Sequence, residues 1–401
     1  MDDKKDQRIR ILYVYNVADS EEMVSALQKS GYEVESYKND KEGVYPVDPA
    51  RIDRFTEYIQ THGITHLMSI GLIYDLTVAA QRTGIKYIVI VWDAPYLRMY
   101  SPYGKAENCW FSVFDRLDAQ RFRDVGIDHV LYQPLSINRE SVLAWNRNAR
   151  KMLQGKYIHD ISFVGRLYEN NLYDQHLHQI PREMQNYFTS IFEESAFLWD
   201  GVNRIYGKTS KEILDYIRMV SPDFHIFNRL DLDDVHMFET MFLVRKIANI
   251  ERIAILNILS EEYDVTFYTT SGAEKDKLGK TKVRLPVLPG KDATVVYAGS
   301  KINLNISLKG IEGGTPQRVM DVLGAGGFML TSFCEETAEI FQEDKELVMF
   351  RTPEELVEKI SYYLSHNQIR EKIAKAGQER VLQHYTYERK LKELMEWVEG
   401  E

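Results

Sequence analysis

The stretch at residues 307–332, SLKGIEGGTPQRVMDVLGAGGFMLTS, contains side chains that could bind a phosphate and a ribose. Its Thr315-Pro316 pair is typical of a helix start, since Thr315 can cap the helix and Pro316 suits the first helical position. The N–H groups of that first turn and the positive end of the helix dipole favour an anion. Arg318 could add a charged hydrogen-bond donor to a diphosphate, and Asp321, one turn deeper, could accept both hydroxyls of a ribose. The same residues are equally compatible with an ordinary strand–helix turn that carries a solvated Arg–Asp pair.

Apolar runs elsewhere in the chain predict the elements that must position this stretch. In the first third of the chain, runs rich in β-branched and aromatic side chains alternate with helical patterns. The expected strands fall at residues 10–17, about 32–37, 65–71, 86–95, 109–115 and 129–135. Near-continuous apolar strands joined by helices indicate a parallel sheet that is covered on both faces. We therefore expect a doubly wound α/β domain at the N-terminus.

The same pattern restarts at residues 160–170 and indicates a second α/β domain. A long, mainly helical stretch follows, from about residue 173 to residue 260. Further strands are expected at 263–272, 302–308, 327–332 and 347–352. Beyond them, apolar side chains recur at three- and four-residue spacing, which predicts two or three helices at the C-terminus.

Composition limits the class of protein. The chain has 401 residues, which suits two domains, and its 44% hydrophobic and 27% charged residues are those of a soluble globular protein. No apolar run reaches the roughly 18 to 20 residues of a membrane span, and the charged N-terminus does not favour a secretory signal. Two cysteines fit a reducing compartment, so we expect a cytoplasmic protein. A net charge of −10 without a basic stripe argues against nucleic acid as a partner.

The segment GGTPQRVMDVLGAGGFMLTS resembles the nucleotide-sugar-binding signature of GT-B glycosyltransferases of the group 1 type. In that signature an acidic residue five positions before a glycine holds the ribose of the sugar donor, and Asp321 with Gly326 keeps this spacing. Together with VWDAP, FSVFD and YQPLSIN, the segment is similar to the spore-maturation (CgeB-type) branch, most clearly over residues 65–138 and 296–350. The commoner group 1 pattern has a glutamate eight residues before the ribose acid, where this chain has Gly313.

The resemblance implies a fold and an activity. The fold would be α/β, with two Rossmann-like doubly wound domains facing a cleft and C-terminal helices that cross back to the first domain. We place an acceptor-side domain at residues 1–150, a nucleotide-sugar-binding domain with a helical insertion at 151–375, and the returning helix at 376–401. The expected reaction moves a sugar from a nucleoside-diphosphate sugar, in our interpretation a UDP-sugar, to a hydroxyl of a sugar, a protein or a surface glycan. The expected partners are therefore that nucleotide sugar and an acceptor glycan or glycosylated protein. No metal and no other cofactor is expected.

The resemblance also implies the residues of the sugar-donor site. Gly165 and Arg166 follow the first strand of the second domain, where the superfamily uses a glycine and a basic residue beside the diphosphate. Tyr268 could stack on a pyrimidine or belong to the core, and Lys301 could be a second phosphate contact. The full set is Gly165, Arg166, Tyr268, Lys301, Asn305, Gly314, Thr315, Gln317, Arg318 and Asp321.

The first domain should supply the acceptor side and any general base. Ligands of open parallel sheets bind outside the carboxyl ends of the strands, so residues directly after strands are the candidates. Asp93 follows a buried strand beside Trp92 and Tyr96, and it is either a desolvated general base or a turn-capping carboxylate. The other candidates on this side are Asn16, Gly71 and Asp115.

Two further readings remain open at this point. The Asp-x-Asp of LDLDD, residues 230–234, could hold a metal, but its position between helical segments favours an acid-rich helix start. For the function, one alternative is a nucleotide-sugar 2-epimerase on the same fold, and another is a non-catalytic nucleotide- or glycan-binding module.

Overall fold

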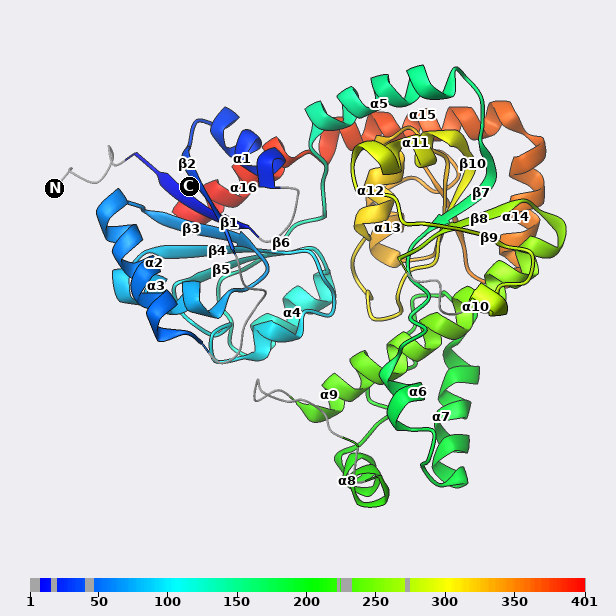
Figure 1. Ribbon diagram of the computed structural model, residues 1–401, viewed down its shortest axis with the longest axis horizontal. Coiled ribbons are helices and arrows are strands. Elements are labelled where there is room, and N and C mark those ends of the chain that lie inside the picture. Colours follow the sequence, from blue (N-terminus) through cyan, green and yellow to red (C-terminus); the bar gives the residue numbers. More distant parts are fainter. Residues whose placement is uncertain are drawn as a thin grey trace. The chain divides into compact units, whose positions relative to one another are not determined.

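A computed structural model describes residues 8–15, 20–39, 47–221, 224, 233–270 and 275–400, and it divides them into two units. Unit 1 comprises the described residues up to Asn138 together with those from Tyr385 onward, and unit 2 those from Arg139 to His384 (Figure 1). Among the helices of the described residues, none is both long enough and apolar enough to cross a membrane.

Unit 1 is built on one six-stranded parallel sheet with the strand order β2-β1-β3-β4-β5-β6. Its elements are β1 Arg10–Tyr15, α1 Ser20–Lys29, β2 Glu33–Lys38, α2 Pro49–His62, β3 His66–Ile70, α3 Tyr74–Thr83, β4 Lys86–Val91, the 3-10 turn η1 Leu97–Tyr100, β5 Cys109–Val113, α4 Arg116–Asp124, β6 Val130–Tyr132 and, from the far end of the chain, α16 Tyr387–Glu399.

Alternation along the strands of unit 1 separates two cores. Leu12 and Val89 face a core with α2 and α3, whereas their neighbours Ile11 and Ile88 face a core with α1 and α16. Since successive side chains of a strand point to opposite faces, both faces of the sheet are buried, as the apolar runs predicted.

The C-terminal helix returns to unit 1. The backbone N–H groups of Ile137 and Tyr387 donate to the carbonyls of Tyr385 and Ile137 at 3.0 and 2.9 Å, and Thr386 caps α16. The apolar face of α16 then packs on α1 and on the sheet. The expectation that a C-terminal helix crosses back to the first domain is confirmed.

Unit 2 contains a second six-stranded parallel sheet, ordered β12-β11-β10-β7-β8-β9. Its elements are α5 Arg139–Leu153, β7 His159–Val164, α6 Leu172–His176, α7 Arg182–Ser195, α8 Lys211–Val220, α9 Asp234–Phe238, the π-helical turn η2 Glu239–Val244, α10 Arg245–Glu262, β8 Val265–Tyr268, the 3-10 turn η3 Lys275–Lys277, β9 Lys282–Arg284, α11 Lys291–Gly299, β10 Ser300–Asn305, α12 Gln317–Gly324, β11 Met329–Ser332, α13 Glu335–Ile340, β12 Val348–Phe350, α14 Pro353–Ser365 and α15 Asn367–His384.

Two features of unit 2 matter for a ligand. The direction of strand succession reverses between β7 and β10, which is the point where open α/β sheets form a crevice at the carboxyl ends of their strands. Between β7 and β8 the chain makes helices α6–α10, and Figure 1 shows α6–α9 as a group apart from the sheet. This helical group has its own core, which includes Phe188, Phe238 and Phe242, and α10 connects it to the sheet. The fold class expected from the sequence, two doubly wound α/β domains, is confirmed.

Candidate functional site

A pocket of about 370 Å³ lies in unit 2 at the carboxyl ends of β7, β8 and β10. Its walls come from the strand ends, from the start of α12 and from α10. They are Val164, Gly165, Arg166, Tyr168, Arg252, Tyr268, Thr269, Thr270, Pro286, Val287, Asn305, Ile306, Ser307, Leu308, Ile311, Pro316, Gln317 and Arg318. We call it the arginine pocket, because the formally charged side chains among its described lining residues are all arginines. The strand-order reversal at β7 and β10 explains why the crevice forms here.

The three arginines give the pocket an excess of positive charge. Arg166 is exposed, Arg318 is half-buried and Arg252 is only 4% exposed. The Nη1 of Arg318 donates to Asn305 Oδ1 at 3.1 Å, which points its guanidinium at the end of β10. Within the part of the chain that the structure describes, none of the three makes an ion pair, and no Asp or Glu lines the pocket. Burial lowers the pKa of Arg252 to about 10, so the residue remains a cation at neutral pH. An anionic ligand is the complement of this charge.

Glycine at position 165 allows Arg318 to approach β7. A Cβ at Gly165 would lie 3.1 Å from the ring of Phe163 and 3.5 Å from Arg318 Nη2. The Arg318 guanidinium lies over that ring, 5.7 Å from its centroid. A Cβ at this position would therefore crowd the Phe163 ring and would lie in van der Waals contact with the guanidinium.

The start of α12 differs from the sequence expectation in one respect. The helix begins at Gln317 with Pro316 as its N-cap residue, which makes no side-chain capping hydrogen bond. The prediction that Thr315 caps this helix is wrong. Thr315 is fully buried, and its hydroxyl bonds instead to Glu336 and, at 2.9 Å, to Thr337. The Thr315 hydroxyl is therefore hydrogen-bonded to side chains of α13 and does not cap α12. The first turn of α12 lies at the edge of the arginine pocket.

The other predicted sugar-donor residues divide into two groups. Gly165, Tyr268, Asn305 and Gln317 line the pocket, whereas Gly314, Thr315, Lys301 and Asp321 do not. Gln317 Nε2 donates to Asp321 Oδ1 at 2.8 Å, so the pocket-lining amide lies directly beside the predicted ribose acid. Lys301 is in the first half of β10, at the opposite end from Asn305, and pairs with Asp160 at 2.7 Å. The hydroxyl of Tyr268 is bonded to His159 Nε2 at 2.8 Å.

The predicted acceptor-side residues lie in unit 1, at the carboxyl ends of the neighbouring strands β3, β4 and β5. Gly71 follows β3 with φ +74° and donates its N–H to Ile90 at 2.8 Å. Asp93 follows β4 in a bend, and its side chain is exposed. Asp115 follows β5 and is the N-cap of α4, where it accepts the N–H groups of Leu117 and Asp118. Asn16 lies outside the described residues.

Asp118 is a buried carboxylate that the sequence argument missed. It accepts the backbone N–H of Tyr96 at 3.3 Å and lies 3.1 Å from Arg121. Burial, reinforced by the charge of Asp115, raises the pKa of Asp118 to about 7. The sequence signal that could have identified Asp118 is its position three residues after Asp115, the acid that follows β5. Through its bond to Tyr96, Asp118 connects α4 to the loop that carries Asp93.

Arg252 is the second residue that sequence reasoning missed. It lies within the long helical stretch before β8, where an arginine in an amphipathic helix has no distinguishing pattern. Only the packing of α10 beside β7 and β10 brings it to the pocket.

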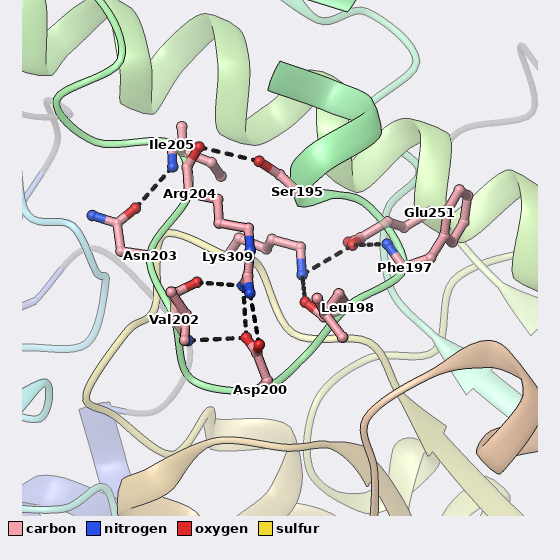
Figure 2. Close-up of polar contacts among 10 residues, drawn as sticks. All are labelled: Ser195, Phe197, Leu198, Asp200, Val202, Asn203, Arg204, Ile205, Glu251 and Lys309. Carbon is pink, nitrogen blue, oxygen red and sulfur yellow. Dashed lines mark hydrogen bonds and ion pairs between the residues drawn. The ribbon is translucent and has the colours of Figure 1, made fainter. Parts of the chain in front are cut away.

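The loop after α7, residues 198–203, lines one side of a smaller cavity next to the arginine pocket. Figure 2 shows the polar contacts of this loop. Arg204 holds this loop by two bonds of 2.7 Å to the carboxylate of Asp200. The cavity, of about 60 Å³, shares Ser307, Leu308 and Ile311 with the arginine pocket. Its volume corresponds to a few water molecules rather than to a whole sugar.

Within the described ranges, no three His, Cys, Asp or Glu side chains are grouped so that they could hold a metal ion. Of the LDLDD motif, residues 230–232 lie outside the described part, Asp233 caps α9 and Asp234 pairs with Arg218. The acid-rich helix start expected here is confirmed.

The fold and the pocket define a class of protein. Two Rossmann-like units, a C-terminal helix that returns to the first, and a crevice with a helix start are the elements of the GT-B glycosyltransferase fold. Residues 243–396, which include α10, β10 and α12, match the family model described as Glycosyl transferase-like. No curated protein matches the chain significantly.

Solved structures of low sequence identity share the fold over nearly the whole chain. A glycosyltransferase from Rickettsia africae is 10% identical, with a TM-score of 0.55 over 98% of this chain and 99% of that one. Sucrose-phosphate synthase from Thermosynechococcus elongatus is 9% identical, with a TM-score of 0.57 over 98% and 100%. The Anabaena protein HepE, in complex with UDP-glucose, is 10% identical, with a TM-score of 0.52 over 98% and 100%. These similarities establish the GT-B fold of this chain.

Proposed function

We propose that this protein transfers a sugar from a nucleoside-diphosphate sugar to an acceptor hydroxyl. The observation that carries the proposal is the arginine pocket, whose described lining residues include three arginines and no acid, at the carboxyl ends of a parallel sheet and at the start of α12. A diphosphate esterified at both ends carries two negative charges, which this pocket complements. The glycosyl transferase-like family match of residues 243–396 supports the same reaction class.

Each wall of the pocket takes one part of the proposed sugar donor. Arg318, Arg166 and the first turn of α12 bind the diphosphate and stabilise it as negative charge develops on the leaving group. Tyr268 and its neighbours in the β8 loop receive the base. Asp321, whose carboxylate accepts a hydrogen bond from the pocket-lining Gln317, binds the ribose. In this scheme arginines and helix N–H groups do the electrostatic work, and the transfer needs no metal.

We further propose UDP as the nucleotide and a hexose as the transferred sugar. HepE, which shares the fold, has been crystallised with UDP-glucose. The spore-maturation branch is the proposed subfamily, on the strength of the sequence motifs around Arg318 and Asp93. The acceptor is a hydroxyl of a sugar, a protein or a surface glycan.

Asp93 is the proposed general base of an inverting reaction. It follows a central strand of unit 1 and is exposed, so that an acceptor hydroxyl can reach it. In a retaining reaction, a phosphate oxygen of the sugar donor would take that proton instead.

A panel of UDP-, GDP- and dTDP-sugars tests the proposal. The protein is incubated with each sugar, without acceptor, and both thermal stabilisation and release of nucleoside diphosphate are measured. We expect stabilisation and slow hydrolysis with at least one UDP-sugar, and a loss of both in Arg318→Met. No stabilisation and no release with any member of the panel would refute the transferase assignment. Stabilisation without release of nucleoside diphosphate would favour a non-catalytic binding module. Transfer assays with candidate acceptors would then distinguish such a module from a transferase.

A further inference from the structure

Helix α10 is joined to the two loops that form opposite walls of the arginine pocket. Arg252 Nη1 donates to the carbonyl of Arg166, in the loop after β7, at 2.6 Å. Its Nη2 donates to the carbonyl of Ile306, directly after β10, also at 2.6 Å. One turn earlier, Asn249 Nδ2 donates to the carbonyl of Leu167 at 3.0 Å. A single guanidinium therefore links the β7 loop to the β10 loop.

The neighbouring Glu251 raises the pKa of Arg252 through its charge but makes no ion pair with it. Figure 2 shows its carboxylate beside the backbone N–H of Phe197 and the amine of Lys309, at 3.1 and 3.2 Å. Lys309 also donates to the carbonyl of Leu198 at 2.6 Å. Glu251 thus binds the loop after α7 through Phe197 and the loop after β10 through its ion-pair partner Lys309. No ion pair of Arg252 occurs among the described residues.

Arg252 is therefore a buried cation without an ion-pair partner among the described residues. It is 4% exposed, and its Nε has no hydrogen-bond partner in the described part of the chain. The rings of Tyr168 and Phe163 lie 5.0 and 5.5 Å from its guanidinium carbon, which partly compensates the lost hydration. A buried charge without a counter-ion opposes folding, so its presence beside a pocket calls for a ligand that compensates it.

We propose that Arg252 is a positioning residue for the diphosphate of the sugar donor, an inference that rests on the proposed function. Its two carbonyl bonds fix the distance between the β7 and β10 loops, and with them the places of Arg166 and Asn305, the latter bonded to Arg318. Its charge adds to the field that these arginines create. Arginine suits the position because its planar fork can reach two carbonyls at once, whereas the single ammonium of lysine cannot hold both in that geometry.

The experiment compares Arg252→Met, Arg252→Lys and the matched control Arg245→Lys, an arginine on the same helix that does not line the pocket. Calorimetry measures the affinity for UDP, and an NMR titration measures the affinity for uridine, which has no phosphate. We expect Arg252→Met to weaken UDP binding about 10- to 100-fold and to leave uridine binding unchanged. Arg252→Lys should lose about tenfold for UDP because it keeps the charge but not both carbonyl bonds. The control should bind both ligands as the wild type does.

The outcomes separate this inference from the function on which it rests. If the wild type binds neither UDP nor uridine, the proposed UDP-sugar function fails. If the wild type binds UDP and both Arg252 variants bind it equally well, the positioning role is refuted and the function stands. An equal loss of UDP and uridine binding would mean that Arg252 only maintains the fold. Should Arg252→Met fail to fold, the ratio of UDP to uridine affinity in Arg252→Lys decides between these outcomes.

Discussion

Replacing Lys390 by methionine should stabilise unit 1 at neutral pH. Lys390 lies on α16 with a side chain that is 6% exposed, and its Nζ has no hydrogen-bond partner among the described residues. Burial lowers its pKa from 10.5 to about 7. Since each pH unit between the unfolded and folded pKa corresponds to about 1.4 kcal/mol, the buried lysine opposes folding by about 4 kcal/mol at pH 7. Methionine has a similar length and carries no charge.

The pH dependence gives the prediction its sign. The unfolded chain binds the Lys390 proton more tightly than the folded chain, because the folded pKa is the lower one. The stability contributed by the neutral form is therefore complete above about pH 10.5 and is lost as the pH falls to about 7. Lys390→Met should raise the free energy of unfolding by a few kcal/mol at pH 7, and this gain should shrink steadily towards pH 10.

The assay is urea unfolding at pH 6, 7.5 and 9, followed by hydrogen exchange in peptides from β1 to β6 so that unit 1 is read separately. The control is Lys392→Met on the same helix, where the exposed lysine pairs with Glu396 at 3.6 Å and should contribute almost nothing. If Lys390→Met is no more stable than the wild type at pH 7.5, or if its gain is the same at pH 6 and pH 9, burial does not lower the pKa of Lys390.

Three further outcomes are expected. Arg318→Met should weaken UDP binding about 10- to 100-fold, whereas Lys301→Met, at the other end of β10, should not change it; calorimetry on both variants checks this. Asp93→Asn should abolish transfer in an inverting enzyme while UDP binding stays at the wild-type level, and full activity in the variant would exclude Asp93 as the base. Because the pKa of Asp118 is raised in the folded state, its stabilising contribution is complete below about pH 4 and is lost as the pH rises towards 7. Asp118→Asn should therefore show a smaller fall in unfolding free energy between pH 4.5 and 7.5, and an unchanged slope would contradict the burial argument.

Local pattern was sufficient for the fold because both sheets are buried on two faces. Strands such as residues 10–15 and 86–91 carry continuous runs of apolar side chains, and the helices that follow them have regular apolar spacing. The strand ends therefore indicate which loops lie at the carboxyl edge, and Gly165, Asn305 and Arg318, which the resemblance implied, line the pocket there. The same logic misjudged Thr315, since a Thr-Pro pair before a helix signals a cap only if no tertiary partner takes the hydroxyl first.

Arg252 is a pocket residue that the positions of strand ends do not predict. A residue after a strand is placed by the topology of its own βα unit, but Arg252 is in the middle of an 18-residue helix and reaches the site only because α10 packs beside β7 and β10. Its contacts are to main-chain carbonyls, which leave no complementary side chain in the sequence to search for. Glu251, the preceding residue of the same helix, does not face Arg252, and its carboxylate pairs with Lys309. The charge that makes Arg252 relevant to an anionic ligand is therefore a property of the packed helix, and sequence alone can assign it neither the pocket nor its missing counter-ion.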